Sequence, residues 1–246
     1  MVDYKAKKQK KMDTWWQSDL GQCLFAEEQE VLQSLTNHFY GYYQLQVGVT
    51  EILLPANPRP CRQLVMAPMA DVDGAAELLP FQSSSIDTLL LPHLLSFSTD
   101  PHQVLREADR VLVADGTLVL CNFNPWSLWG LRRLFSWQDA LPWSGSFIGL
   151  PRLKDWLALL NFEVVSVKSL MFRPPLTTVN GLKRFVGMEQ WGKRLWPFFA
   201  GAHIIIARKQ TIPLTPVTQR WRPGKLFPTG KLASKPITRE GIDGQS

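Results

Sequence analysis

Residues 77–120 decide the fold, and they read ELLPFQSSSIDTLLLPHLLSFSTDPHQVLREADRVLVADGTLVL. Ile86–Leu91 is a short apolar run between serines and a proline, which predicts a buried strand. An Asp-Pro pair favoured at helix starts, followed by apolar residues spaced by three or four, predicts a helix over 100–113. Thr117–Phe123 is apolar and β-branched and follows an Asp-Gly turn, so it predicts a second buried strand.

The flanking sequence repeats this alternation of short apolar runs and longer amphipathic segments. It predicts further helices over Phe25–Tyr43 and Arg152–Leu160, and further strands over Tyr43–Val49, Gln63–Ala67, Phe162–Val167 and Gly201–Arg208. The alternation is typical of an α/β protein with a mostly parallel sheet. The last two strands are candidates for antiparallel pairing.

Composition indicates one folded domain between two tails. The chain has 246 residues, of which 45% are hydrophobic and 20% charged, as in ordinary globular proteins. The tail segments are residues 1–13, which are rich in lysine, and residues 211–246, which carry five prolines and few apolar side chains. We therefore expect a domain over 14–210.

Membrane spanning, secretion and metal binding are all disfavoured. The longest apolar stretch, 196–207, is shorter than the roughly 20 residues that cross a bilayer, and no apolar signal core follows the N-terminal lysines. The three cysteines are far apart and have no histidine partner at metal-ligand spacing, so neither a disulfide framework nor a metal site is expected. A reducing cytoplasm fits best.

The positive charge of the chain lies in its tails. Five lysines against two aspartates give residues 1–13 a charge of +3, and six basic against two acidic residues give residues 211–246 a charge of +4. Of the total of +6, this leaves −1 for residues 14–210. A nucleic-acid partner is therefore expected to bind, if at all, through the tails, and RNA methylation guided by them is one open alternative.

The ordered motifs of residues 77–120 resemble those of class I S-adenosylmethionine-dependent methyltransferases of the type 11 kind. A Leu-Pro-Phe segment, a Ser-x-Asp strand start, an Asp-Pro helix with an Arg-Val-Leu ending and a glycine turn follow one another as in that family. The likeness extends over about 40–209. LPHLLSFSTDPHQVLRE followed by CNFNPWSLWG is most similar to the YafS-like subgroup. The resemblance implies a Rossmann-like fold with a C-terminal antiparallel strand.

The resemblance also implies a cofactor site, at the carboxyl ends of the first, second and fourth strands of the family. Its residues here would be Gln46 and Gly48 in the first loop, Ala67 and Pro68 after the second strand, Glu77 and Leu79 near the adenine, and Leu91 and Pro92 beside the methyl group. S-adenosyl-L-methionine is the implied cofactor.

The cofactor half also departs from the family pattern. Only Gly48 remains of the glycine-rich first loop. No acidic residue directly follows the second strand, because Asp71 and Asp73 come a few residues later, and Ala75 stands where the family often has aspartate. Prolines break what would be the first crossover helix. These departures favour an alternative, a degenerate methyltransferase-fold binding module without catalysis.

His93 is the candidate catalytic residue. It directly follows the predicted strand Ile86–Leu91, where it could take a proton from a substrate hydroxyl, although a structural, hydrogen-bonding histidine is the more common occurrence. His102 and His203 are expected to be structural. Asn124-Pro125-Trp126 resembles the Asn-Pro-Pro-Tyr motif of amino-methylating enzymes, but it follows the fifth strand instead of the fourth and lacks the second proline.

Two aromatic segments have no assigned role. Trp126, Trp129, Trp137 and Trp143 either cover a flat substrate or border a helix whose Leu128, Leu131, Leu134 and Phe135 pack on the sheet. The segment 181–199 mixes aromatic and basic residues, which suits a substrate cap or a contact with lipid headgroups.

The function predicted from the sequence is S-adenosylmethionine-dependent methyl transfer to an acceptor that the sequence does not identify.

Overall fold

The computed structural model describes Met12, residues 14–56, 59–67, 70–135 and 141–176, Gly192 and residues 196–211. The chain divides into two units, Met1–Thr211 and Ile212–Ser246, and every element below belongs to the first. Most of the predicted tails, Trp137, Pro68 and most of the segment 181–199 lie outside the described residues.

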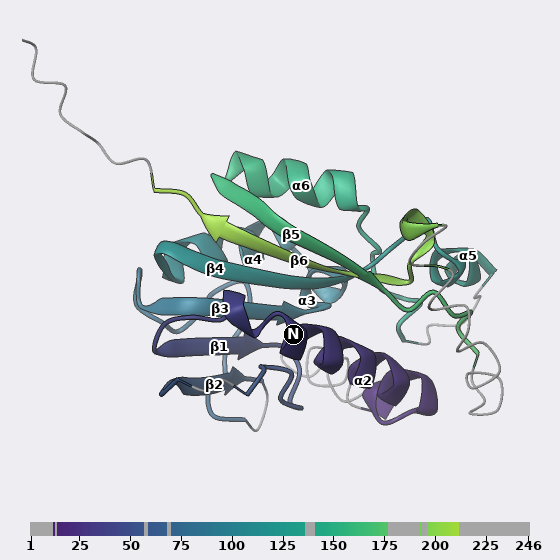
Figure 1. Ribbon diagram of the computed structural model, residues 1–246, viewed down its shortest axis with the longest axis horizontal. Helices are drawn as coiled ribbons and strands as arrows, with labels where there is room; N and C mark the ends of the chain where they lie inside the picture. The colour runs from purple at the N-terminus through teal and green to yellow at the C-terminus, as the bar shows by residue number, and fades with distance from the viewer. Residues whose placement is uncertain are drawn as a thin grey trace, which may run out of the picture. The chain divides into compact units, whose positions relative to one another are not determined.

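A six-stranded mixed sheet in the order β2-β1-β3-β4-β6-β5 forms the centre of the first unit (Figure 1). Its strands are β1 (Tyr43–Val47), β2 (Arg62–Met66), β3 (Ile86–Pro92), β4 (Leu112–Phe123), β5 (Phe162–Leu170) and β6 (Ala202–Lys209). The first four strands pair in parallel, and β6 is antiparallel to both β4 and β5. The predicted α/β, Rossmann-like fold with a C-terminal antiparallel strand is confirmed.

The strand order reverses at β1. Leu45 of β1 is in register with Leu64 of β2 on one side and with Leu89 of β3 on the other. The chain therefore leaves β1 in one direction and returns to β3 on the opposite side, which makes the boundary of β1 and β3 the topological switch point. In open α/β sheets, ligands bind outside the carboxyl ends of the strands at this point.

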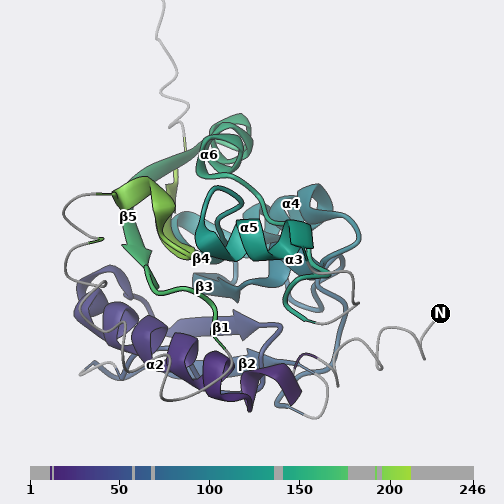
Figure 2. The same cartoon turned by 90° about the vertical axis from the view of Figure 1, so that its right-hand side faces the viewer.

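Helices cover both faces of the sheet. They are α2 (Asp19–Ser34), α3 (Leu94–Phe97), α4 (Pro101–Val111), α5 (Leu128–Phe135) and α6 (Leu150–Leu159), with the 3-10 turns η1 (Thr36–His38) and η2 (Pro197–Phe199). The buried stripe of α2 packs on one face, and α4 and α6 pack on the other (Figure 2). Among the described residues, no helix is both long and apolar enough to traverse a lipid bilayer.

The caps explain where two helices begin. The Asp100 side chain accepts a hydrogen bond from the amide of Gln103 at 3.0 Å, which confirms the predicted start of α4. In α2, the Ser18 hydroxyl accepts from the Gly21 amide, so this helix begins six residues before the predicted Phe25 and ends well before Tyr43. The predicted turn at Asp115 lies inside β4, where Asp115 has a φ of 59° and the pairing with β3 shifts register.

One interpretation of the sequence placed the leucine side of helix α5 against the sheet, and the structure shows the opposite orientation. Leu128, Leu131, Leu134 and Phe135 were expected to pack on the sheet, and all four are exposed. The buried side of α5 carries Trp129 and Gly130 instead. Trp129 stacks on Phe123 of β4, and its indole nitrogen donates to the Arg173 carbonyl oxygen, so this side of the helix faces the protein. The prediction was wrong because helical spacing identifies an apolar stripe but not the surface it faces.

Candidate functional site

Gly48 and the residues that follow β3 meet at the switch point. Gly48 has a φ of +106°, a conformation that L side chains rarely adopt, and its amide donates a hydrogen bond to the Met66 carbonyl of β2 at 2.9 Å. A Cβ at Gly48 would lie 2.9 Å from Cδ1 of Leu94, just beyond β3. The structure therefore requires glycine at this position and brings the predicted first loop against the end of β3.

Gln46 holds the loop after β1 in shape. Its buried carboxamide nitrogen donates to the carbonyl oxygens of Val49 and Glu51 at 2.8 and 2.7 Å, and its oxygen accepts from the Leu53 amide at 2.8 Å. These bonds occupy the side chain of Gln46 within the protein. Its contribution to a ligand site would therefore be to position the backbone of this loop.

The acidic residues after β2 do not replace the missing family aspartate. Ala67 is buried directly after β2, and Pro68 lies outside the described residues. The carboxylate of Asp71 accepts a hydrogen bond from the Val65 amide at 2.9 Å, so it is bound to the strand backbone. We therefore expect this site to bind the two hydroxyl groups of a ribose more weakly than a site with a free carboxylate at this place.

A partly buried ion pair anchors the Leu-Pro-Phe segment. The carboxylate of Glu107 accepts from the Leu79 amide at 2.9 Å, and the Arg110 guanidinium donates to the carbonyl oxygens of Leu79 and Phe81 at 2.9 Å. Arg110 also donates to Glu107 at 2.8 Å. The hydrogen bond from Arg110 lowers the pKa of Glu107, and the same bond raises the pKa of Arg110. Leu79 is thus held in place by α4.

Glu77 is tied to the end of α3. Its carboxylate accepts a hydrogen bond from the Ser98 hydroxyl at 3.1 Å, and its carbonyl oxygen accepts from the Gln103 side chain at 3.4 Å. The segment that carries Glu77 and Leu79 is therefore fixed at both ends, by α3 and by α4. Such fixed backbone suits a wall of a ligand site.

Leu91 and Pro92 end β3 as buried residues, and His93 follows with an unusual backbone conformation. Its φ is 49°, in the left-handed region that residues other than glycine seldom occupy. The His93 amide donates to the Cys121 carbonyl of β4 at 2.9 Å. Positive φ values at non-glycine residues concentrate at functional sites, because the surrounding structure must enforce them.

The His93 side chain is held by a buried glutamate. Its Nε2 lies 2.6 Å from Oε1 of Glu28 on α2, and the side chains are 1% and 0% exposed. The imidazole stacks on Phe123 with ring centroids 3.9 Å apart, and the Trp16 ring lies 5.7 Å away. Because a carboxylate only accepts hydrogen bonds, an ionised Glu28 fixes the His93 proton on Nε2 and leaves Nδ1 as an acceptor.

Three polar atoms around this pair have no partner. Trp16 Nε1, Glu28 Oε2 and His93 Nδ1 are buried and lack a hydrogen bond within the described part of the chain. An unpaired buried polar atom destabilises a protein by roughly 1–3 kcal/mol. The cluster therefore offers one donor and two acceptors to a polar group that enters it.

Sequence reasoning missed Glu28, Trp16 and the ion pair of Glu107 with Arg110. A signal for Glu28 was present, because it interrupts the apolar four-residue spacing of Leu20, Leu24 and Leu32 on the buried side of α2. An acidic residue inside such a stripe needs a buried partner. The identity of that partner depends on the tertiary fold, since His93 is 65 residues away.

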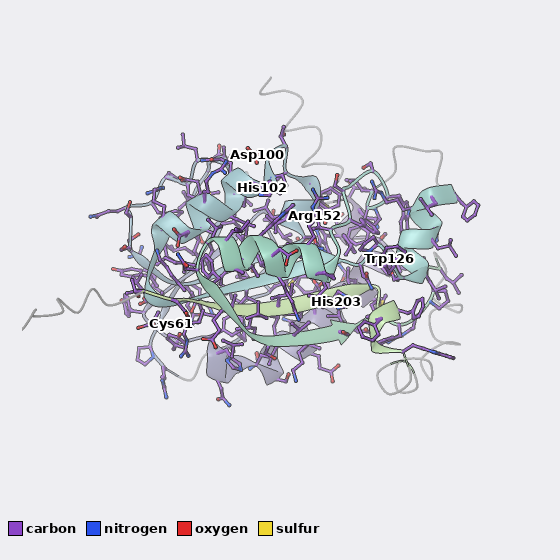
Figure 3. The ribbon with its side chains drawn as sticks, turned by 90° about the horizontal axis from the view of Figure 1, so that it is seen from above. Cys61, Asp100, His102, Trp126, Arg152 and His203 are labelled. Carbon is purple, nitrogen blue, oxygen red and sulfur yellow. The ribbon has the colours of Figure 1, made fainter. Side chains whose placement is uncertain are left out.

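The other candidate side chains contact other groups of the protein. The Asn124 amide donates to the carbonyl oxygens of Phe198 and Ala200 at 2.7 and 2.9 Å, so it is not free to bind a substrate amine. His203 in β6 bonds to the Ser169 hydroxyl, and burial, aided by the charge of Lys154, lowers the pKa of His203 to about 4. His102 packs against Trp156 near the start of α4 (Figure 3). Among the described residues, no three histidine, cysteine or acidic side chains gather as a metal site.

The sequence is similar to methyltransferases and to proteins of unstated activity. The methyltransferase domain family matches residues 56–120. Uncharacterized protein YafS of Escherichia coli strain K12 is 33% identical over 238 residues, which are 94% of this chain and 90% of YafS. The malonyl-acyl-carrier-protein O-methyltransferase of Xylella fastidiosa is 30% identical over 96 residues, 39% of this chain and 32% of that enzyme.

Solved structures support the fold. An S-adenosylmethionine-dependent methyltransferase of Thermotoga maritima superimposes with a TM-score of 0.53 at 18% identity, covering 76% of this chain and 89% of its own. The 4+2 cyclase SpnF superimposes with a TM-score of 0.50 at 15% identity, covering 75% and 80%. At such identities the likeness concerns the fold alone, and the cyclase illustrates that one fold serves several reactions. The family match, the relatives and the solved structures reported above do not support the alternative prediction of a binding module without catalysis.

Proposed function

The chain belongs to the class I methyltransferases of the type 11 family, in the YafS-like group, and on this premise we propose that it transfers a methyl group from S-adenosylmethionine to an acceptor beside His93. The observation that carries the proposal is that Gly48, at the switch point between β1 and β3, has a positive φ and leaves no room for a Cβ beside Leu94. Glycine with positive φ is needed there, and this is the edge at which open α/β sheets bind ligands.

The cofactor would be held by residues that follow β1, β2 and β3. The backbone around Gly48, shaped by Gln46, would contact its amino-acid part, and Ala67 and Pro68 would border the ribose. The segment with Glu77 and Leu79, anchored through Glu107, would form the adenine wall, and Leu91 and Pro92 would border the methyl group. Because Asp71 is bound to the strand backbone, we expect weaker binding than in enzymes with a free carboxylate at that place.

His93 would serve as the general base. S-adenosylmethionine supplies an already activated methyl group when bound, so the protein has to align the acceptor and receive its proton. With its proton on Nε2 facing Glu28, His93 would take the acceptor proton at Nδ1, and the carboxylate would stabilise the resulting imidazolium. This chemistry suits an acceptor hydroxyl or another nucleophile that must lose a proton.

Access to His93 would require movement of the N-terminal segment. Trp16 is buried against His93, and the Trp15 ring lies 6.1 Å from Phe123. The Gln22 side chain donates to the Trp16 carbonyl oxygen at 3.1 Å, which holds this segment on the first turn of α2. We therefore propose that the acceptor enters as Trp16 moves away. We also propose a cytoplasmic location, which suits three cysteines that form no disulfide.

Two glycines at opposite ends of β1 provide a matched test. Gly41 precedes β1 with a φ of +90°, and Gly48 follows it with a φ of +106°, so alanine strains the backbone at either position. Calorimetric titration with S-adenosylhomocysteine should give a dissociation constant at least about tenfold weaker for Gly48→Ala, and a nearly unchanged one for the folded fraction of Gly41→Ala. Equal weakening in both variants, or no binding by the unaltered protein, would contradict the proposal.

A further inference from the structure

Helix α5 presents its apolar stripe to solvent. Leu128, Leu131, Leu134 and Phe135 follow one another at helical spacing of three, three and one, and Leu134 and Phe135 are 78% and 73% exposed. The two arginines of the helix are half-buried, and their guanidinium groups lie over aromatic rings. The Arg132 guanidinium lies 5.0 Å from the ring centroid of Trp143, and that of Arg133 lies 5.4 Å from Phe147.

The aromatic residues of η2 extend this stripe. Trp196, Phe198 and Phe199 are exposed, and so is Trp126, which precedes α5. The amide of Asn124 donates to the carbonyl oxygens of Phe198 and Ala200, so η2 is bonded to the turn that starts α5. Trp126 lies at the same end of the fold as both elements (Figure 3). We call these eight exposed side chains the aromatic surface: Trp126, Leu128, Leu131, Leu134, Phe135, Trp196, Phe198 and Phe199.

The two described segments that carry the aromatic surface hold charge of one sign. Its two segments, 124–135 and 196–201, contain Arg132 and Arg133 and no aspartate or glutamate. Neither arginine pairs with a carboxylate within the described part of the chain. Their cationic groups lie over the rings of Trp143 and Phe147. An apolar surface whose own described segments carry only arginine charge matches a partner that is apolar inside and negatively charged outside.

We propose that the aromatic surface docks this protein on an anionic lipid bilayer. Soluble monomers rarely expose so many large apolar side chains together, and tryptophan, phenylalanine and leucine beside arginine are the residues that favour the bilayer interface. A second copy of the chain fits less well, because a two-fold contact through this surface would bring like-charged arginines together. The inference is independent of methyl transfer, since vesicle binding requires no cofactor.

Two leucines provide a matched pair of variants. Leu134 on α5 and Leu159 at the end of α6 are 78% and 81% exposed, so glutamate at either position changes charge equally and disturbs little packing. The full chain would be sedimented with vesicles of phosphatidylcholine alone and of phosphatidylcholine mixed with phosphatidylglycerol, at low and high salt. The basic tails contribute equally to every variant.

The wild-type chain should bind the mixed vesicles, and Leu134→Glu should lower its partition coefficient roughly tenfold, whereas Leu159→Glu should leave it within about twofold. Phe198→Glu on η2 should reproduce the loss, and thermal unfolding would establish that each variant is folded. Absent binding by the wild-type chain, or equal effects of Leu134→Glu and Leu159→Glu, would overturn the proposal. So would a lipid-free dimer that Leu134→Glu dissociates, because the surface would then be a contact between copies.

Discussion

The imidazole Nε2 of His93 lies 2.6 Å from Oε1 of Glu28, and both side chains are almost completely buried. This contact joins helix α2, near the start of the described chain, to the end of β3 at the carboxyl edge of the sheet. It determines which imidazole nitrogen can act on a substrate. Two of the unpaired buried atoms of the fold, Glu28 Oε2 and His93 Nδ1, belong to the same pair.

The tautomer of His93 is the first prediction. Because an ionised Glu28 carboxylate could only accept this hydrogen bond, we expect nitrogen-15 NMR of a neutral His93 imidazole to show a protonated Nε2 and an unprotonated Nδ1. The variant Glu28→Leu removes the acceptor, and we expect its free energy of unfolding to fall by about 1–3 kcal/mol because His93 is left unpaired. A spectrum with the proton on Nδ1 would rule out His93 as a base through that nitrogen.

The ion pair of Glu107 with Arg110 predicts a dependence of stability on acid. The pKa of Glu107 is lowered in the folded state, chiefly by the hydrogen bond from Arg110, so its contribution is present above the ordinary carboxyl pKa and is lost as pH falls through the folded value. Glu107→Gln should reduce the free energy of unfolding by about 1–2 kcal/mol near neutral pH. Urea unfolding should then show a shallower loss in acid for the variant than for wild type. Parallel curves would contradict this assignment.

His203 predicts a second pH range, less acidic than the first, in which the stability of the fold changes. Burial first, and the charge of Lys154 second, lower its pKa to about 4, whereas an unfolded histidine titrates near 6.5. The unfolded chain therefore binds the extra proton between these values, and stability falls as pH falls from about 6.5 to about 4, by up to about 3 kcal/mol. His203→Asn should remove this part of the slope. An NMR titration that places the pKa of His203 near 6.5 would refute the prediction.

Much of the fold could be predicted from local sequence. The Asp-Pro start of α4 and the apolar run of β3 are signals carried by neighbouring residues, and both elements lie within two residues of their predicted bounds. Helix α2 was placed too late, because the predicted stretch began at Phe25 and overlooked the cap that Ser18 supplies. The orientation of α5 was not predictable from spacing, since it follows from the packing of Trp129 on Phe123 of β4.

The candidate site was only partly predictable. The need for glycine at position 48 followed from the family pattern, and the structure gives it a physical reason in the positive φ. That Gln46 and Asp71 are occupied by backbone groups could not be read from the sequence, because their partners are set by the path of the loops. The pairing of His93 with Glu28 depends likewise on how α2 packs across the sheet.

Thermal unfolding with and without S-adenosylmethionine or S-adenosylhomocysteine tests the central claim most directly. A ligand present at 100 times its dissociation constant stabilises the folded state by about 2.7 kcal/mol, so the unfolding temperature should rise clearly with either compound. Methionine, which lacks the adenosyl group, should not raise the unfolding temperature at the same concentration. An intact unfolding transition that neither cofactor shifts, even at about millimolar ligand, would contradict the claim that this fold binds S-adenosylmethionine.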